Sequence, residues 1–553
     1  MKYPIAFFWV TLLIGMVVLL HPYFQVGVPD THDGNNHLVR FANYKIAIKE
    51  GQFPPRWAPN LMNQYGYPVF NFNYPLSNIL SLPFSILKLP YELIFKILVA
   101  GYVVVGAYFV KKWLELFSVE KSGIGIAIFA WLFFPFLAST IYYRGNIGEI
   151  AAYGLIPAML YIAEYARQHR ISYKLISSFI LLMSGFLLSH NLTVVFFIPL
   201  YAFYLALRYW SNWSAWRRLL PIAAISVLLS MWFWLPAVAE MQLTNITSTG
   251  LSREYYQHFA TIEQLLFSPL QFGYSVPGQI DGLSFSIGLT TVVVMTLGLL
   301  LTILTLIRSQ KLNETSWLLF GSSLAISVLA FLQTNYSVWM WQLFSVAEVI
   351  QFPWRLSIYI GVLTALGAYL LWRENSILIK ALLVGAVVVS IFSTAQANEH
   401  SLLHRERIEY DSQSITTDIL GENRPRIFSY GYEEQWEPTA KVLSGEADVS
   451  SISWSGTKRK YTIIASTEAV VVESTAYFQG WETTVSNGST YTKISYIDDA
   501  TIKGRIAYKV VPGNYQVTTQ FTQNTWPRLT GNVISAAAVV VLLFIFVKKV
   551  NYE

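Results

Sequence analysis

The chain has 553 residues, of which 54% are hydrophobic and only 13% are charged, whereas about a quarter of the residues in soluble domains carry a charge. The net charge of +6 does not indicate nucleic-acid binding, because the basic residues lie in short clusters between apolar runs, as in the cytoplasmic loops of membrane proteins. The chain contains no cysteine, which excludes disulfides and thiolate metal sites.

Apolar runs long enough to cross a bilayer recur along most of the sequence. A membrane-spanning helix needs about 20 apolar residues, and we expect about a dozen such helices. The first run is followed by His21-Pro22 rather than by a small-residue cleavage site, so we interpret it as an uncleaved span and not as a signal peptide. The predicted spans are residues 4–21, 91–110, 122–141, 149–166, 175–189, 192–207, 219–238, 285–307, 316–332, 356–372, 377–393 and 529–547.

Clusters of basic residues predict which loops face the cytoplasm, where Lys and Arg are retained. With Lys2 inside, the clusters at 111–112, 167–174, 208–218, 308–311, 373 and 548–549 all fall on the cytoplasmic side. The segments predicted outside are 22–77, 142–148, 239–284, 333–355 and 394–528, and these hold most of the polar motifs. Residues 76–88 either re-enter the membrane or span it, and only re-entry keeps residues 111–112 inside.

The first predicted outer loop, residues 22–77, is too long to be a simple connector. Asp30 and Asp33 flank Thr31-His32 and precede a predicted helix that places His37, Arg40 and Tyr44 on one face. Two carboxylates beside an imidazole can bind a divalent ion such as Mg²⁺ or Mn²⁺, or deprotonate a hydroxyl group. In the alternative interpretation Asp33 caps the helix and Asp30 fixes a turn.

Later outer segments carry further polar residues at the ends of spans. Arg144 and Glu149 flank a glycine-containing turn and form either a structural ion pair or part of a site. His190 and Asn191 interrupt an apolar hairpin, where such a polar pair either bridges helices or lines a cavity.

The sequence Gln351-Phe352-Pro353-Trp354-Arg355 opens another span on the predicted outer side. The arginine fork can pair two oxygens of a lipid phosphate at once. The alternative is an interfacial arginine whose head group reaches water. Glu240 and Glu348 are further acidic candidates.

The composition changes after residue 394. Segments rich in Val, Thr, Ile and Tyr alternate with turn signals such as Asn487-Gly488 and Pro512-Gly513, which predicts strands and hairpins. The predicted strands are 460–465, 469–477, 481–486, 489–496, 505–511 and 515–521. We therefore divide the chain into a transmembrane domain (1–393), an extracytoplasmic β-sandwich-like domain (394–528), and a last helix with a short cytoplasmic tail (529–553).

In their order along the chain, these motifs resemble the GT-C class of integral-membrane glycosyltransferases. More narrowly, they resemble the YfhO-type proteins and the group labelled "6-pyruvoyl-tetrahydropterin synthase-related" membrane proteins. The matching pieces are residues 30–40, 51–57, 144–149, 234–236, 352–355, 480–481 and 512–515.

The resemblance implies a GT-C-like fold and a polyprenyl-phosphate-linked sugar donor used on the outer face. It also implies an acidic residue of the first outer loop as catalytic base or metal ligand, which corresponds to Asp30 or Asp33. Their Asp-x-x-Asp spacing differs from the Asp-x-Asp pair of some GT-C enzymes, which leaves metal dependence open.

The leading hypothesis is an inverting glycosyltransferase of the cell membrane that modifies an envelope glycan, lipid or protein. Asp30 or Asp33 would activate the acceptor hydroxyl, while Arg355, with Arg144, would stabilise the charge that builds on the departing lipid phosphate. The residues predicted to line the substrate cavity are His32, His37, Arg40, Arg56, Glu149, His190, Asn191, Glu240, Gln351 and Trp354.

Two other classes of protein remain as alternatives. A transporter or flippase is expected to have paired broken helices with charges at mid-membrane, whereas the charges here gather at one predicted face. A non-catalytic assembly protein would use the β-rich domain to bind envelope polymers, and the motifs would be purely structural.

Overall fold

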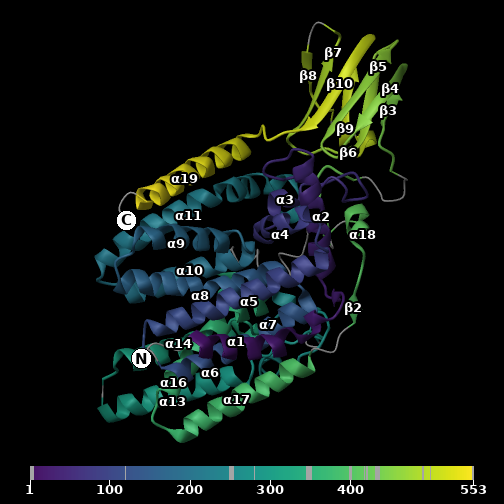
Figure 1. Ribbon diagram of the computed structural model, residues 1–553. Helices are drawn as coiled ribbons and strands as arrows, with labels where there is room; N and C mark the ends of the chain where they lie inside the picture. The colour runs from purple at the N-terminus through teal and green to yellow at the C-terminus, as the bar shows by residue number, and fades with distance from the viewer. Residues whose placement is uncertain are drawn as a thin grey trace.

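The chain folds into a bundle of helices with a β-sandwich at one end, as the computed structural model shows (Figure 1). The structure describes residues 5–118, 120–247, 255–278, 281–309, 311–343, 351–397, 401–415, 417–418, 421–429, 436–488, 491–497 and 500–550. The prediction of a polytopic helical membrane protein with a β-rich C-terminal region is thereby confirmed.

Each predicted span corresponds to a helix. Within the described residues, nine helices are long and apolar enough to cross a membrane, or ten if the bent pair made of α6 (Lys121–Leu132) and the helical segment Pro135–Arg144 is one span. Two predicted spans fall on shorter apolar helices, α1 (Ile5–Leu20) and α9 (Tyr173–Leu187). The nine helices are α5 (Tyr91–Glu115), α8 (Ile147–Gln168), α10 (Asn191–Tyr209), α11 (Trp213–Ala239), α13 (Leu289–Ser309), α14 (Glu314–Phe331), α16 (Ser357–Trp372, preceded by the 3₁₀ turn Pro353–Leu356), α17 (Ile377–Gln396) and α19 (Trp526–Val550).

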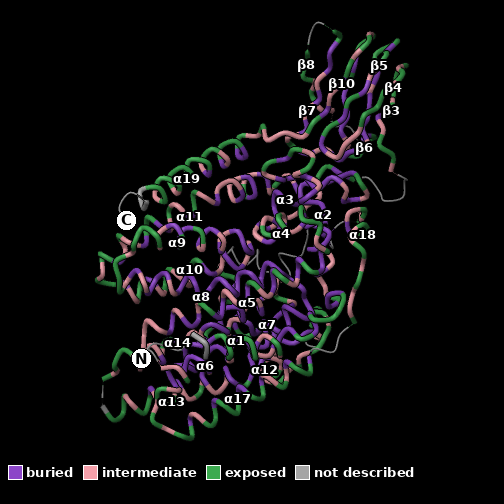
Figure 2. The backbone as a smooth tube through the Cα atoms, in the orientation of Figure 1, coloured by how far each residue is buried: buried purple, intermediate pink, exposed green. Residues whose placement is uncertain are grey.

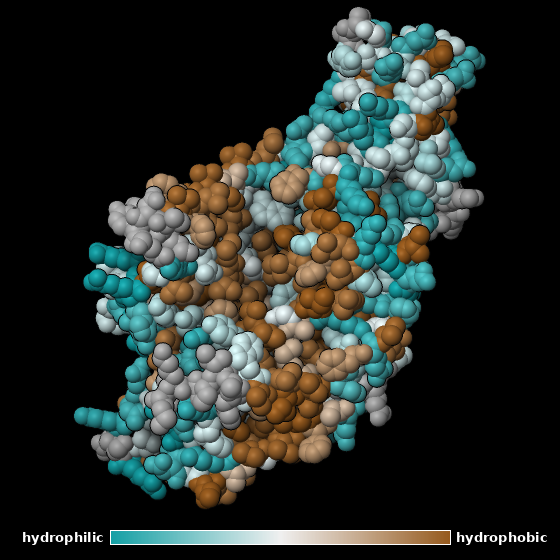
Figure 3. Space-filling view, viewed as in Figure 1, coloured by the Kyte–Doolittle hydropathy of each residue, from teal (hydrophilic) through white to brown (hydrophobic). Residues whose placement is uncertain are grey.

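The outer surface of the bundle is apolar between its two ends. Large apolar side chains are exposed there, and Figure 3 shows a hydrophobic middle between hydrophilic ends. Such a surface is stable against lipid, because the helices satisfy their own backbone hydrogen bonds. Figure 2 shows that α8 is buried within the bundle, whereas α19 is largely exposed. The helix α16 is likewise enclosed by its neighbours.

Residues 76–88 do not form a span of their own. The helix α4 (Leu76–Ile86) has 11 residues, which extend about 16 Å at 1.5 Å per residue, short of a hydrocarbon core of about 30 Å. It packs against α2 (Gly34–Lys49) and α5, and its buried side chains are mainly serine and asparagine. Other short helices are α3 (Val69–Phe72), α7 (Pro135–Ser139), α12 (Ile262–Phe267), α15 (Val338–Gln342) and α18 (Arg407–Ser412).

The segments predicted to lie on one side of the membrane meet at one end of the bundle, which we call the loop end. The contacts include the pairing of β1 (Val28–Pro29) with β2 (Leu402–Leu403), an amide-to-carbonyl hydrogen bond from His32 to Tyr143, and isolated bridges from Thr244 to Pro425 and from Ala260 to Thr334. The β-sandwich is attached to this same end (Figure 1).

The opposite end, which we call the basic end, gathers loops predicted to be cytoplasmic. Glu164, near the end of α8, accepts hydrogen bonds from Arg167 at 2.8 Å and from Arg208 at 2.6 Å. Arg208 also donates to Glu314 at 3.1 Å. The loops predicted to be cytoplasmic therefore meet at one end of the bundle, and the side of the membrane that this end faces stays a prediction.

The C-terminal sandwich consists of two antiparallel sheets. The five-stranded sheet has the order β4-β5-β10-β7-β8, and the three-stranded sheet has the order β3-β6-β9. Buried side chains such as Ile463, Val471 and Val517 face each other between the sheets. The strands are β3 (Ala440–Ser444), β4 (Ala447–Trp454), β5 (Lys458–Ala465), β6 (Ala469–Ala476), β7 (Trp481–Ser486), β8 (Tyr491–Ile494), β9 (Arg505–Val510) and β10 (Gly513–Phe521).

Candidate active site

The turn that carries Asp30 and Asp33 is docked on the turn that carries Arg144. The amide of His32 donates to the carbonyl of Tyr143 at 3.0 Å, and the amide of Asp33 donates to the carbonyl of Arg144 at 2.8 Å. Two such backbone bonds fix the position of the first loop against a turn more than a hundred residues further along the chain.

Gly145 allows this close approach. Its φ of +62° lies in the left-handed region, which glycine adopts without steric cost. A Cβ atom at this position would lie 2.0 Å from the Thr31 hydroxyl oxygen and 2.8 Å from the amide nitrogen of Gly34. Any other residue would therefore separate the two turns.

The carboxylate of Glu149 is the electrostatic centre of the site. Glu149 lies in the first turn of α8 and is 1% exposed. Both of its oxygens accept hydrogen bonds from the Arg144 guanidinium, one of them at 2.7 Å. Arg355 Nε lies 3.2 Å and His190 Nε2 lies 3.8 Å from Oε1 of the same carboxylate. The Glu149 carboxylate thus faces two guanidinium groups, and the carboxylate of Asp33 lies close enough to act on both of them.

Arg355 keeps unused hydrogen-bonding capacity. Its Nε atom is buried and, despite its closeness to Glu149, does not have the geometry of a hydrogen bond. Within the described residues, neither terminal nitrogen has a hydrogen-bond partner, and the side chain is 18% exposed. The centroid of the Phe352 ring lies 5.0 Å from the guanidinium carbon of Arg355. The centroid of the Trp354 ring lies 6.0 Å from the guanidinium carbon of Arg355 and 4.6 Å from that of Arg144. These rings hold the cations in place by cation–π contact.

A chain of hydrogen bonds links Asp33 to the start of α8. Asn146 donates from Nδ2 to Oδ2 of Asp33 at 3.2 Å, and its Oδ1 accepts from the Glu149 amide at 3.1 Å and from the Tyr74 hydroxyl at 2.9 Å. Tyr74 also lies 3.3 Å from His37 Nε2. Asn146 therefore caps the helix and positions the carboxylate of Asp33 at the same time.

Asp33 does not cap the helix that it precedes. Its side chain makes no capping hydrogen bond, and the Thr31 hydroxyl accepts from the Gly34 amide instead, at 3.1 Å. The carboxylate of Asp33 is half-buried, and its Oδ1 atom has no hydrogen bond to a described residue. Asp30 is exposed, and its amide donates to the carbonyl of Ser401 at 3.0 Å.

The two histidines of the first loop are held in their neutral form. Burial, with Arg40 and His190 nearby, keeps the pKa of His37 well below its ordinary value. Burial also lowers the pKa of His32, and Arg144 adds to this effect while Asp33 opposes it. Neutral rings add no positive charge beside the arginines.

His32 is covered by a segment that follows α12. Its ring stacks on Tyr274, with centroids 4.5 Å apart, and meets Phe272 edge-on at 4.9 Å. Its Nε2 atom is buried and has no hydrogen-bond partner among the described residues. Sequence reasoning did not select Tyr274 or Phe272, because nothing local to 255–278 indicates contact with the first loop.

The other predicted cavity residues lie near this group or in a second cluster. Asn191 donates to the Phe72 carbonyl at 2.8 Å, and Gln351 is half-buried. Arg40 is tied to Thr417, through hydrogen bonds of 3.0 and 2.9 Å. Glu348 lies outside the described residues.

Arg56 and Glu240 belong to the second cluster, which also contains Asn71 and Arg528. Asn71 accepts from Arg56 at 3.1 Å and donates to Glu240 at 2.8 Å. Arg528 donates to the same Glu240 oxygen at 3.1 and 2.9 Å. Arg56 and Arg528 are completely buried, so this cluster joins the first loop, α11 and α19 and offers no opening to a substrate.

The two carboxylates do not complete a metal site by themselves. Within the part of the chain that the structure describes, no three His, Asp or Glu side chains converge as metal ligands. Mg²⁺ prefers six oxygen ligands and is often held by one or two carboxylates together with substrate phosphates and water.

Comparison with known proteins gives only distant matches. The sequence matches no known protein family and no curated protein. Among solved structures, the chain is similar to the mycobacterial arabinofuranosyltransferase AftD, at 14% identity and a TM-score of 0.42 over 71% of this chain and 26% of that one. It is also similar to ArnT from Cupriavidus metallidurans bound to undecaprenyl phosphate, at 12% identity and a TM-score of 0.41 over 76% of this chain and 78% of that one. The chain thus spans about a quarter of the length of AftD, and these values are too low to assign it to either family.

Proposed function

We propose that this protein is a membrane glycosyltransferase of the GT-C type, which takes a sugar from a polyprenyl-phosphate donor and transfers it to an acceptor hydroxyl. The observation that carries the proposal is the arrangement of Arg355. Its guanidinium is fixed by aromatic rings and by the Glu149 carboxylate, yet its terminal nitrogens donate to no described residue. Such a fork is suited to bind two oxygens of a phosphate group at once.

The charge of the cluster suits the departure of a lipid phosphate. A sugar linked to a lipid phosphate carries one negative charge at a phosphodiester, and its cleavage produces a monoester that carries up to two. Arg355 and Arg144 are balanced by the carboxylates of Glu149 and Asp33 before the reaction. When Asp33 takes up the proton of the acceptor, the cluster gains a net positive charge, so it stabilises the departing phosphate more than it stabilises the intact donor. Such preorganised groups lower the barrier, because they bind the transition state better than the substrate.

Asp33 is the proposed catalytic base. Asn146 holds one of its oxygens, which leaves the other available to the acceptor. Asp33 accepts the proton of the acceptor hydroxyl, and the acceptor oxygen attacks the anomeric carbon. The bond from this carbon to the phosphate oxygen breaks with inversion, and the phosphate leaves with the electron pair beside Arg355. Asp30 is more exposed than Asp33, and its proposed role is to attract or orient the acceptor rather than to accept the proton.

The position of the charged residues favours an enzyme over a flippase. Arg144, His190 and Arg355 each lie next to the first turn of a helix at the loop end, whereas transporter sites lie near mid-membrane on broken helices. The loop end then faces away from the cytoplasm, because basic residues gather at the other end. The acceptor is accordingly an envelope glycan, lipid or protein.

The test is transfer by the purified protein in detergent or nanodiscs. Radiolabelled polyprenyl-phosphate sugars are supplied with a panel of envelope acceptors, and both labelled product and free polyprenyl phosphate are measured. We expect the two to appear in equal amounts and to be lost together in Arg355→Ala. Movement of labelled lipid across vesicles without cleavage would instead identify a flippase.

A further inference from the structure

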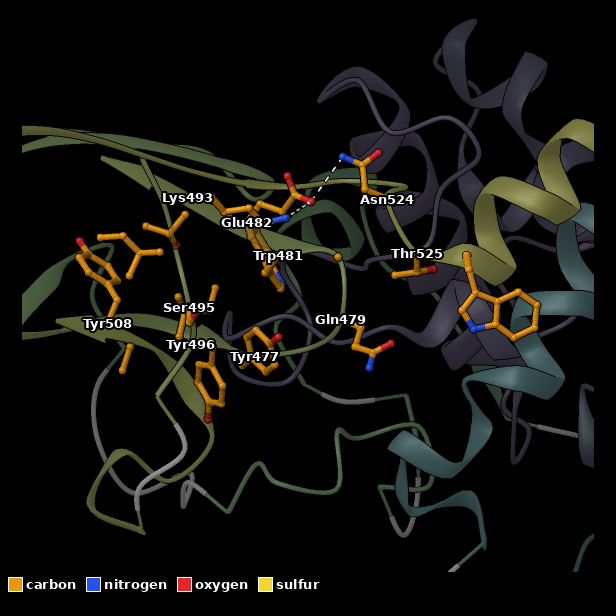
Figure 4. A pocket seen from close by; sticks show the side chains of 16 residues that line it. Tyr477, Gln479, Trp481, Glu482, Lys493, Ser495, Tyr496, Tyr508, Asn524 and Thr525 are labelled. Carbon is orange, nitrogen blue, oxygen red and sulfur yellow. Dashed lines mark hydrogen bonds and ion pairs between the residues drawn. The ribbon is translucent and has the colours of Figure 1, made fainter. Parts of the chain in front are cut away.

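A pocket of about 710 Å³ lies in the C-terminal sandwich, next to the beginning of α19 (Figure 4). It is bounded by β7 and the edge strand β8 of one sheet, by the edge strand β9 of the other, and by residues 524–526. The pocket thus opens between the two sheets, at the side of the sandwich nearest the membrane-spanning helix. Its size is in the range of small-molecule sites, large enough for a short oligosaccharide.

Aromatic rings form much of the wall. Tyr477 and Tyr496 stack in parallel with centroids 3.8 Å apart. Trp481 contributes a largely buried ring whose Nε1 atom has no hydrogen-bond partner among the described residues. Trp526, in the first turn of α19, is 69% exposed at the rim.

Polar side chains lie between these rings, and the charges of the two ionised ones, Glu482 and Lys493, cancel. Glu482 accepts from Lys493 at 2.8 Å and from Asn524 at 3.4 Å, as the dashed lines in Figure 4 show. Gln479 and Ser495 are exposed in the lining and make no side-chain hydrogen bond to a described residue. The lining therefore offers both hydrogen-bond donors and acceptors. Among the described residues that form it, the one basic side chain, Lys493, is paired with Glu482, so they provide no unpaired cation that would bind a phosphate.

We propose that this pocket binds the sugar units of a glycan chain. Pyranose and furanose rings present apolar C–H faces and a rim of hydroxyl groups, so they pack on flat aromatic rings and exchange hydrogen bonds with amide, hydroxyl and carboxylate groups. A lipid tail would leave the Gln479 and Ser495 side chains without hydrogen-bond partners and would place hydrocarbon against the paired charges of Glu482 and Lys493, at a cost in free energy. This inference goes beyond the proposed function, since saccharide binding here requires neither the donor nor the Arg355 cluster.

The experiment measures saccharide binding by the full chain in nanodiscs. Soluble glucan, mannan, galactan, arabinan and chitin oligosaccharides of two to six units are screened by saturation-transfer NMR, and the best ligand is titrated. Tyr477→Ala and Tyr496→Ala should each weaken its binding by about three- to tenfold, the effect of losing one aromatic contact. Tyr491→Ala is the matched control, because Tyr491 lies at the start of β8, the strand that precedes Tyr496, is 83% exposed and does not line the pocket.

A second variant covers the case in which removal of a tyrosine unfolds the sandwich. Ser495→Trp fills the pocket from an exposed position and should abolish binding while the melting temperature stays that of the wild type. Arg355→Ala should bind as the wild type does, which separates this proposal from the transfer reaction. Absence of binding to every oligosaccharide, or unchanged binding in Ser495→Trp, would overturn the proposal.

Discussion

Arg355 lies 3.2 Å from the carboxylate of Glu149 without a hydrogen bond between them. The ion pair holds the guanidinium near the centre of the site, while its terminal nitrogens stay available within the described structure. An arginine whose nitrogens all donate to the protein would only stabilise the fold. Arg355 is held in one orientation, yet its terminal nitrogens can still donate hydrogen bonds to a ligand.

Replacing Arg355 distinguishes a phosphate clamp from an interfacial anchor. A charge-assisted hydrogen bond contributes about 1.5–3 kcal/mol, so losing one should slow turnover by about ten- to a hundredfold. Arg355→Ala should be nearly inactive and Arg355→Lys should retain a little activity, because a lysine binds as a point charge. Turnover with a polyprenyl-phosphate sugar is the measurement, and Arg373→Lys at the basic end is the control. Wild-type rates in Arg355→Lys would remove the clamp from the mechanism.

Replacing Glu149 should primarily affect stability. Glu149→Gln preserves the shape of the side chain but leaves Arg144 and Arg355 without their compensating charge. Breaking a buried ion pair from one side costs about 3–5 kcal/mol, so the melting temperature in detergent should fall markedly. Glu437→Gln, which removes one partner of an exposed pair with Lys441, is the control and should melt as the wild type does. An unchanged melting temperature in Glu149→Gln would mean that the cluster is not held by this carboxylate.

Replacing Asp33 should affect turnover and leave stability near that of the wild type. Asp33→Asn cannot accept a proton, yet it can still accept the hydrogen bond from Asn146, and it removes no helix cap because Thr31 makes that bond. We expect transfer to be abolished in Asp33→Asn and reduced in Asp30→Asn. Thr31→Ala, which removes the hydrogen bond to the Gly34 amide, should have the opposite effect. It should lower the free energy of unfolding by about 1 kcal/mol and leave transfer measurable. Full activity in Asp33→Asn would place the base elsewhere.

The orientation of the protein can be tested with single cysteines, since the chain contains none. Lys49→Cys in the first loop and Tyr491→Cys in the sandwich are both exposed, and both should react with an impermeant thiol reagent in intact cells. Trp210→Cys, which is 89% exposed at the basic end, should react only after permeabilisation. The reverse pattern would place the loop end in the cytoplasm.

The spans and the site differ in how far sequence alone could predict them. Each span follows from local length and hydropathy, and so the helices were predictable. The strands β3 and β4 were missed because most of their residues are exposed, which removes the alternation that identifies a strand. Residues 76–88 were ambiguous, because an apolar run of this length fits either a short buried helix or a span.

The site residues were found as short motifs, but their contacts were not predictable. Glu149 meets Arg144 within one motif, whereas its contact with Arg355 joins residues about two hundred positions apart. Tyr74 was missed, because residues 65–75 of the first loop are rich in aromatic side chains and no local pattern distinguishes one of these rings from another. Such pairings depend on how the helices pack, which no local pattern encodes.

The cluster of Arg56, Glu240 and Arg528 has a consequence for biosynthesis. Arg56 and Glu240 are made early, but the partner that neutralises Glu240 lies in the last helix of the chain. Until α19 has been synthesised and inserted, the nascent protein holds a carboxylate at the membrane surface without its arginine, which is unfavourable in a buried position. Docking of α19 therefore supplies the charge that Glu240 lacks until then, and a chain interrupted before Arg528 should be less stable than one that contains it.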